Sequence, residues 1–320
     1  MDSITQAALG AAIGHSLISE KIGKKGALLG AIVATVPDLD VILYLFYDKL
    51  DMLSIHRGFS HSLVFSLLGA LLIAVVLNRI KWFRNVKFKI LLLFSWLCLF
   101  THMLLDTFTA YGTQLYLPFS KKRIGFDSIN VVDPLYTIPL LIGLFLSLFV
   151  YSSKSDSTKY NTYGIVISSL YLIFTLINKE IVNSKISERL SDEKIEYNSL
   201  LTMPVGIANI NWYGVAKSQD SIYMLQHSVL LHIDNSIEVF PINDEYLNLI
   251  DQRTADKMRW FAKGYYTVEK VNDKIRIYNL QVDMRGIIKT ENIKAPTAGY
   301  FEIENINGIS KFSSGSIDSK

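Results

Sequence analysis

The sequence predicts an α-helical, polytopic membrane domain of about six helices, followed by a smaller, β-rich α+β soluble domain. The 320-residue chain is 50% hydrophobic and only 19% charged, whereas soluble domains carry about 25% charged residues. Its mean hydropathy is +0.28. The charges are also unevenly distributed: residues 1–177 hold 15 Lys/Arg and 10 Asp/Glu, and residues 178–320 hold 17 and 19. We therefore expect residues 1–177 to lie in the membrane and residues 178–320 to lie in water.

Each predicted membrane helix corresponds to a stretch of about 20 mostly apolar residues, the length that crosses a bilayer. Five stretches reach this length or come close to it, and the one nearest the start of the chain is shorter. In chain order they are residues 4–19, 26–46, 62–77, 88–110, 132–150 and 162–177.

The orientation follows from the basic residues in short loops, which favour the cytoplasmic side. The loop after the third stretch carries five of them between residues 79 and 89, so we place it in the cytoplasm. Alternation then puts ten Lys/Arg inside and five outside, with the cluster at 121–123 as the outer exception. Six spans therefore predict an extracytoplasmic domain at residues 178–320, on the same side as the loop at 48–60.

Residues 178–320 have the pattern of a mixed, β-rich domain. Three segments dense in Tyr, Val, Ile and Leu predict strands; they are residues 221–233, 264–271 and 274–282. Asn272-Asp273 predicts a turn between the last two. Residues 178–199 predict a charged helical linker, and residues 313–320 predict a disordered tail.

Composition also excludes some classes of function. The single cysteine, Cys98, lies in an apolar run, which excludes a disulfide framework and a cysteine metal cage. The net charge of +3 is small and dispersed, so we expect no nucleic-acid partner. The expected partner is the lipid bilayer.

Ionisable residues in apolar stretches are costly and usually functional. Asp38 and Asp40 lie within the second stretch, next to Pro37. Two residues apart, they point to nearly opposite sides of a regular helix, but Pro37 disfavours a regular helix there. Either both carboxylates face one site, or one is a ligand and the other supports it. A helix end whose carboxylates meet water is the alternative.

Two histidines flank a short loop just before the third stretch. His56 and His61 are five residues apart, so one regular helix could not direct both at one point. Gly58 permits a turn, and Ser60 is a suitable N-cap for the next helix. We expect the two imidazoles to converge and, beside carboxylates, to suit zinc, manganese or iron. Histidines satisfied by water and backbone are the alternative.

A third pair lies late in the fourth stretch. His102 and Asp106 are four residues apart and therefore share one helix face. Asp106 is either a ligand itself or a residue that orients His102. With the topology above, this pair, the two aspartates and the two histidines all fall at the extracytoplasmic side. We therefore predict one metal site there, with the ligands Asp38, Asp40, His56, His61, His102 and Asp106.

Four further polar residues stay undecided. Asp127 and Asp133 could reach the same site or could serve as turn and helix-cap residues. Gln6 falls at the depth of the two aspartates, whereas His15 falls towards the cytoplasmic end.

The chain resembles the YdjM-like family of bacterial membrane-bound metal-dependent hydrolases, in its longer branch with a C-terminal soluble domain. The motifs that carry the resemblance are MDSITQ at 1–6, LGAA at 9–12, PDLD at 37–40, HRGFSHSL at 56–63, THMLLD at 101–106 and VDPLY at 132–136. It extends to the later residues through Trp212 and the run at 260–266. The resemblance implies a multi-span protein of the bacterial inner membrane and a metal-dependent hydrolase, without a substrate. Many members carry His where this chain has Gln6.

The hypothesis that follows is a membrane-bound hydrolase in which metal-activated water attacks an ester or phosphoester at the outer membrane face. Asp38 and Asp106 are the candidate catalytic carboxylates, and Arg57 could pair with a phosphate, for example in a lipid head group. A non-enzymatic ion or proton pathway through the same His and Asp residues is the first alternative. A membrane-anchored binding protein, in which residues 178–320 carry the function, is the second.

Overall fold

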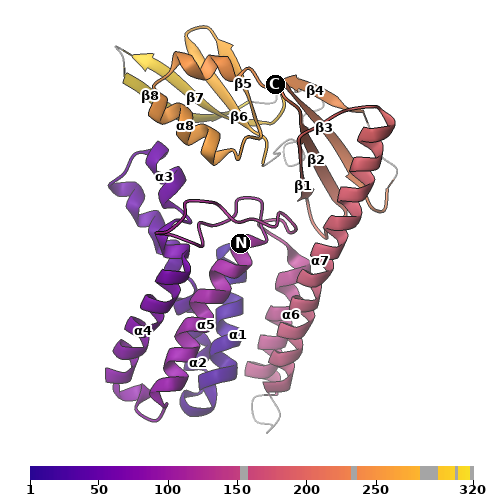
Figure 1. Cartoon of the computed structure of the whole chain (residues 1–320). Coiled ribbons are helices and arrows are strands. Elements are labelled where there is room, and N and C mark those ends of the chain that lie inside the picture. The colour runs from indigo at the N-terminus through magenta and orange to yellow at the C-terminus, as the bar shows by residue number, and fades with distance from the viewer. Residues whose placement is uncertain (152–157, 232–235, 282–294, 307–308, 318–320) are drawn as a thin grey trace. The chain divides into compact units, whose positions relative to one another are not determined.

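The computed structural model describes residues 1–151, 158–231, 236–281, 295–306 and 309–317 (Figure 1). The described chain forms two compact units. One comprises Met1–Leu43 and Ile55–Leu176, and the other comprises Tyr44–Ser54 and Ile177–Lys320. The boundary near residue 177 agrees with the change in charge along the sequence, and each unit is described by itself below.

The first unit is helical. In chain order its elements are α1 (Ser3–Ile22), α2 (Lys25–Ala34), η1 (Val36–Leu45), η2 (Phe59–His61), α4 (Leu63–Arg79), η3 (Lys81–Phe83), α5 (Phe88–Thr107), α6 (Pro134–Phe145), the π-helical turn η4 (Leu146–Val150) and the first part of α7 (Thr158–Asp192). α1 packs against α2, α5 and α6, and α4 packs against α5. α1 is therefore the helix around which this unit is built.

The expected number of about six spans is not confirmed. Among the described residues, α5 and α7 are long and apolar enough to cross a membrane by themselves. Two bent pairs raise the number to four: α2 with η1, bent by 47°, and α3 (Lys49–Ile55) through η2 with α4, bent by 57°. α1 is 20 residues long but carries Thr5, Gln6 and His15. The α6–η4 segment is short, with Pro139 inside it.

Glycines bring α1 and α2 into close contact. Gly10 and Gly14 on α1 face Gly26 and Gly30 on α2, and the members of each pair are four positions apart. A Cβ at Gly14 would lie 2.1 Å from the Gly26 carbonyl oxygen, and one at Gly30 would lie 2.0 Å from that of Gly10. Small residues four apart let helix backbones approach in this way. The close approach holds the end of α2, and hence Asp38, beside α1.

The second unit contains two four-stranded antiparallel sheets, each in sequential strand order. The first consists of β1 (Ser199–Val205), β2 (Asn211–Lys217), β3 (Ser221–Ser228) and β4 (Glu238–Pro241). The second consists of β5 (Tyr266–Val271), β6 (Lys274–Asn279), β7 (Gly299–Ile306) and β8 (Ile309–Ser316). A helix precedes each sheet, so the unit repeats one helix-and-four-strand arrangement.

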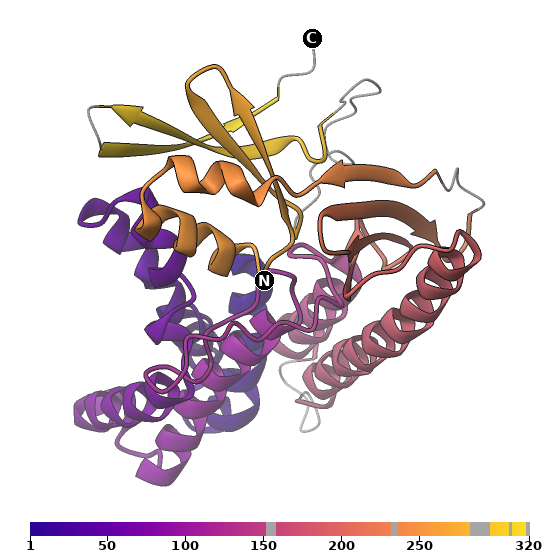
Figure 2. The same cartoon turned by 45° about the horizontal axis from the view of Figure 1, so that its top comes forward.

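Each helix packs on the sheet that follows it. Val182, Ile186 and Leu190 on the end of α7 form a buried cluster with Trp212 and Leu225 of the first sheet. Helix α8 (Gln252–Phe261), after the turn η5 (Asp244–Leu249), lies along the second sheet (Figure 2). There Phe261 contacts Phe301 with ring centroids 5.8 Å apart.

The β-rich prediction for this part of the chain is confirmed. The three predicted strand segments contain β3, β5 and β6, and Asn272-Asp273 forms the turn, with φ of +54° at Asn272. Residues 232, 233 and 282 of those segments lie outside the described residues. Residues 178–192 continue α7 as a helix, and residues 313–316 of the expected tail pair with β7 as the end of β8.

Candidate metal centre

Asp38 enters the site because the second apolar stretch stops being α-helical before it. α2 ends at Ala34, and Val36–Leu45 continue as a 3₁₀ helix that begins with Pro37. The Asp38 backbone N–H donates to the Thr35 carbonyl oxygen at 3.2 Å. In this 3₁₀ turn Asp38 and Asp40 contact different partners. This arrangement corresponds to the sequence-based alternative in which one aspartate is a ligand and the other supports it.

The Asp40 carboxylate is hydrogen-bonded to the loop that carries the two histidines. Its Oδ1 lies 2.8 Å from His56 Nδ1, and its Oδ2 accepts hydrogen bonds from the Arg57 backbone N–H at 3.1 Å and from Ser60 Oγ at 2.8 Å. Arg57 has a φ of +56°, which is uncommon for a residue with a side chain. Three bonds to one carboxylate therefore hold this loop in an uncommon backbone conformation.

His61 lies in the short helix η2 and is fully buried. Its Nδ1 lies 2.9 Å from Ser60 Oγ, and that hydroxyl donates its own proton to Asp40. The hydroxyl therefore accepts from His61, so Nδ1 carries the proton and Nε2 keeps a free lone pair. A second nitrogen held in this way is typical of a metal-binding histidine.

His102 and Asp106 reach the same point from one face of α5, as their spacing predicts. Both are buried. The distance between His102 Nε2 and Asp106 Oδ2 is 3.8 Å. Because Asp106 faces the same nitrogen that points at the other donors, it is placed as a ligand and not as a partner for Nδ1.

Most of the distances between the four donor atoms are close to those of a tetrahedral metal site. Asp38 Oδ1 lies 3.4 Å from both His61 Nε2 and His102 Nε2, the two imidazole nitrogens are 3.2 Å apart, and His61 Nε2 lies 3.4 Å from Asp106 Oδ2. All four atoms lie within 4.8 Å of one another. Bonds of 2.0–2.1 Å in a tetrahedron require donor atoms roughly 3.3–3.4 Å apart. These residues therefore fit a divalent ion.

The chemical surroundings also fit an ion. Asp106 Oδ2 is buried and accepts no hydrogen bond within the described residues. The positively charged Arg57 Nε lies 3.2 Å from it. Three of the four side chains are at most 1% exposed, whereas Asp38 is 25% exposed. A site closed on three sides and open at one donor can admit a further ligand, as catalytic zinc sites do.

Three further groups contact the Asp106 carboxylate. Arg57 Nε lies 3.2 Å from Asp106 Oδ2, and its Nη1 donates to Thr109 Oγ1 at 2.9 Å. Gln6 donates to Asp106 Oδ1 at 3.0 Å, and the Met1 amino group contacts the same oxygen. Gln6 is therefore placed as a residue that positions Asp106.

A second arginine lies beside the first. The guanidinium carbons of Arg57 and Arg123 lie 5.0 and 4.2 Å from the centre of the Tyr111 ring. Burial, reinforced by the charge of Arg57, lowers the pKa of Arg123 to about 10. Arg123 is one of the basic residues that disagreed with the predicted topology. Its side chain is buried, so its charge does not indicate on which side of the membrane this part of the chain lies.

The structure brings together four of the six predicted metal ligands. Asp40 and His56 pair with each other beside the cluster, and the ring centroids of His56 and His61 are 6.2 Å apart. Asp133 is the N-cap of α6 and accepts a bond from the Leu135 backbone N–H at 2.9 Å. Asp127 has a φ of +48° and lies in the segment that bonds to the end of α5.

Ser60, His15 and Arg123 lie outside the group of four donors. Ser62 caps α4, with its side chain accepting from Phe65 N, so the expectation that Ser60 is this cap is wrong. The Ser60 hydroxyl is instead hydrogen-bonded to Asp40 and His61. His15 lies apart from the cluster, with Nε2 2.6 Å from Ser147 Oγ. The sequence carries no local signal for Arg123, because its partner Tyr111 is 12 residues away.

Comparison with known proteins identifies the family. The profile of the YdjM inner membrane protein family matches residues 1–182. The chain is 38% identical over 122 residues to the inner membrane protein YbcI of Escherichia coli (strain K12), which covers 38% of this chain and 69% of YbcI. It is 30% identical over 200 residues to the uncharacterized protein YfhP of Bacillus subtilis (strain 168), which covers 60% of this chain and 59% of YfhP.

The match to YfhP thus spans about three fifths of that relative's length. No solved structure matches the chain. The profile covers all four clustered donors, and the apolar helices of the first unit agree with a location in the inner membrane. The chain therefore belongs to the YdjM inner membrane protein family.

Proposed function

We propose that Asp38, His61, His102 and Asp106 hold one divalent metal ion, and that the chain is a membrane-bound hydrolase of an ester or phosphoester. The observation that supports this most strongly is the convergence of the four donor atoms, of which five pairs are 3.2–3.8 Å apart and all lie within 4.8 Å of one another. Two histidines with two carboxylates suit zinc, manganese or iron. Such an ion lowers the pKa of a coordinated water and polarises the bond to be hydrolysed.

We assign the ligands distinct tasks. His61, His102 and Asp106 are buried and form the closed part of the site. Asp38, at 25% exposure, marks the open side through which water and substrate would enter. Arg57 and Gln6 hold Asp106 in place, because their donors are already directed at that carboxylate. Asp38 and Asp106 remain the candidate catalytic carboxylates, and they would act as metal ligands.

We assign proton transfer to His56. Its Nδ1 is bound to Asp40 and its side chain is 26% exposed, so Nε2 is the ring nitrogen left for a water or a leaving group. A carboxylate on one nitrogen orients an imidazole for acid–base work and stabilises its charged form. The ring lies 6.2 Å from that of His61, next to the cluster but outside it.

We infer an anionic substrate from the two arginines at Tyr111. Arg57 and Arg123 place two positive charges beside the site, which favours a phosphoester over a neutral ester. A lipid head group is a natural source of such a bond for an enzyme embedded in the bilayer. We propose that this face, with the second unit, is extracytoplasmic, as the distribution of basic residues favours.

The deciding experiment is metal analysis of the full chain purified in mild detergent. We expect about one ion per chain in the wild type, loss of that ion in His61→Ala, and retention in His15→Ala, which removes a histidine elsewhere in the same unit. Release of phosphate or alcohol from a panel of phosphoesters and esters then tests hydrolysis. A wild type without stoichiometric metal would contradict the proposal.

A second candidate function, an ion or proton pathway, is favoured by the polar residues at the other end of α1. His15 and Ser147 bond to each other, and with Ser16 and Ser19 they line a cavity of about 570 Å³. Proton flux into liposomes that falls in both His15→Ala and His61→Ala would support a pathway. Hydrolysis that is unaffected by His15→Ala would support the enzyme.

A further inference from the structure

One end of the first sheet is apolar and exposed. Ile207, in the turn between β1 and β2, is 65% exposed, and Leu230 and Leu231, just after β3, are 72% and 62% exposed. The Val229 backbone N–H donates to the Ile210 carbonyl oxygen at 2.9 Å, so the two segments are neighbours. We call Ile207, Val229, Leu230 and Leu231 the sheet tip.

Helix α7 gives the height of the sheet tip relative to the bilayer. Residues 160–178 contain no Asp, Glu, Lys or Arg and are flanked by Lys159 and Lys179. At 1.5 Å per residue, these 19 residues span roughly 28 Å, close to the hydrocarbon thickness of about 30 Å. Asn178 therefore lies at the boundary between hydrocarbon and head groups.

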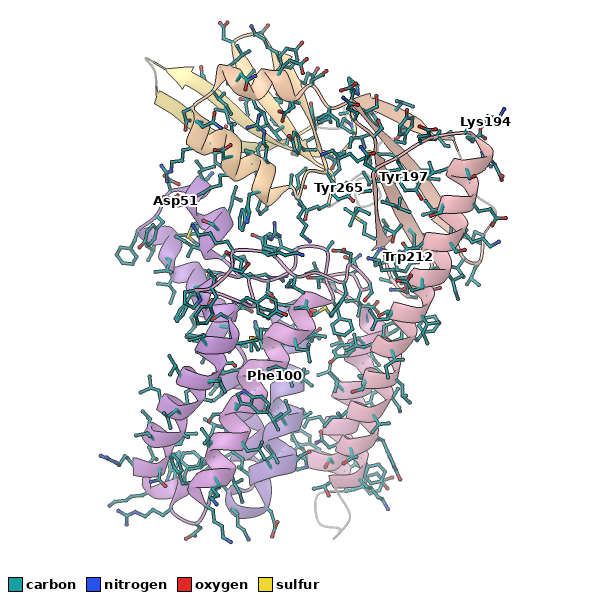
Figure 3. All side chains as sticks on the ribbon, viewed as in Figure 1. Asp51, Phe100, Lys194, Tyr197, Trp212 and Tyr265 are labelled. Carbon is teal, nitrogen blue, oxygen red and sulfur yellow. The ribbon has the colours of Figure 1, made fainter. Side chains whose placement is uncertain are left out.

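The same asparagine is bonded to the turn that carries the tip. Asn178 Nδ2 donates to the backbone oxygen of Asn209 at 2.8 Å and to its side-chain oxygen at 3.0 Å. The indole of Trp212 donates to the same backbone oxygen at 3.0 Å, and Figure 3 shows Trp212 beside α7. Through the cluster with Val182 and Ile186, the sheet is held against the helix. The sheet tip is therefore fixed at the height of the membrane boundary.

Charge separates the two ends of this sheet. Residues 197–216 and 221–231, which include the sheet tip, contain no Asp, Glu, Lys or Arg. Six charged residues lie at the opposite end, in the chain before β1, at the end of β2 and between β2 and β3; they are Asp192, Glu193, Lys194, Glu196, Lys217 and Asp220. Glu238 of β4 pairs with Met224 in the middle of β3. A charge-free apolar tip at the boundary and a charged end away from it match the polarity of an interfacial element.

We propose that the sheet tip is a lipid-binding surface that inserts into the boundary between head groups and acyl chains of the bilayer that α7 crosses. Exposed contiguous apolar side chains mark a contact surface, and the bond to Asn178 places this one where the lipid is. The contact would fix the first sheet against the membrane in addition to its attachment through α7. It is independent of the metal site.

The test uses the full chain in lipid vesicles with an environment-sensitive fluorophore on an introduced cysteine. Cys98 is fully buried, so wild-type protein sets the labelling background. The test positions are Ile207→Cys and Leu230→Cys. The matched control is Val239→Cys, a 55% exposed apolar residue of the same sheet that pairs with Tyr223 near the charged end.

We expect lipids that carry a nitroxide at a shallow acyl position to remove most of the fluorescence at 207 and 230, since interfacial groups insert about 5–10 Å. The label at 239 should respond to aqueous iodide and not to the lipid quencher. Quenching of 207 and 230 by iodide alone would show a solvated tip and overturn the proposal. Protection from both quenchers would show a tip covered by protein, such as a second copy, and would overturn it equally.

Discussion

The two units of this chain both contain clusters of acidic and basic side chains, but the clusters are organised in opposite ways. In the second unit, Arg259 meets Asp244 at 2.9 Å, and Glu302 meets Lys274 at 2.8 Å and Arg276 at 2.9 Å, all on a partly exposed surface. In the first unit, two carboxylates and two imidazoles point their free electron pairs at one buried point. The exposed charges satisfy each other, whereas the buried group could hold a metal ion.

This difference shows which charged clusters indicate a function: the buried ones, and not the exposed ones. The Glu302 contacts contribute little to stability, because water competes for both partners. In the buried cluster Arg57 pairs with Asp106 at 3.2 Å, and ionisable groups in an apolar environment are usually functional. The four predictions below test this comparison.

The largest effect is expected from Asp38→Asn, which removes the most exposed of the four donors. We expect its stoichiometric metal to be lost and its melting temperature to become insensitive to a chelator. In the wild type, a ligand at 100 times its Kd stabilises the folded state by about 2.7 kcal/mol. Asp244→Asn, in the exposed cluster, should keep the wild-type response. A chelator effect that survives in Asp38→Asn would contradict the site.

The next effect concerns the packing that positions the site. A methyl group at Gly14 meets the backbone oxygen of Gly26 at 2.1 Å, whereas one at Gly69 meets only the end of the Leu99 side chain at 3.1 Å. We expect Gly14→Ala to cost about 1–3 kcal/mol, the range for overpacked cores, and Gly69→Ala to cost clearly less. Unfolding of both variants in detergent measures the difference, and equal costs would show that the α1–α2 contact is not tight.

A smaller effect is expected when the partner of a ligand is removed. Ser60→Ala leaves His61 Nδ1 without its hydroxyl partner, and such substitutions lower metal affinity about 10–100-fold. Competition with a metal-binding dye measures the change. Ser66→Ala is the control, because Ser66 Oγ donates to the Leu63 carbonyl oxygen within α4. Unchanged affinity in Ser60→Ala would mean that His61 is oriented by packing alone.

The smallest effect is expected in the exposed cluster. The hydrogen bond from Lys274, opposed by desolvation and aided by Arg276, holds the pKa of Glu302 below its ordinary value of 4.5. The contacts therefore stabilise the fold above that value, and the contribution is lost as the pH falls through the lower folded-state pKa. Glu302→Gln should cost below about 1 kcal/mol at pH 7.

Hydrogen exchange of the β6 and β7 amides measures this cost, and the difference from wild type should shrink as the pH is lowered. A difference that grows in acid would contradict the assignment. If Glu302→Gln destabilised the fold as much as Gly14→Ala, the exposed cluster of the second unit would not be the less important of the two.

Much of the site could be predicted from the sequence because local rules apply to it. The spacing of four positions between His102 and Asp106 places both on one face of α5 whatever surrounds the helix. Pro37 marks the point where a regular helix stops, and an apolar stretch makes any carboxylate within it conspicuous. Three strands of the second unit, β3, β5 and β6, followed in the same way from β-branched and aromatic residues and from the Asn272 turn.

The sequence by itself thus determined the types of donor, the membrane character of the first unit and the β-rich character of the second. Only the tertiary structure decided which donors meet. Asp38 and Asp40, like His56 and His61, are equivalent as residue types, and the choice depends on the 3₁₀ turn at Pro37 and on the loop that Asp40 fastens. Ser60 and Arg123 acquire their roles from partners on other segments. Contacts between distant segments depend on how the helices pack, and no local pattern encodes that packing.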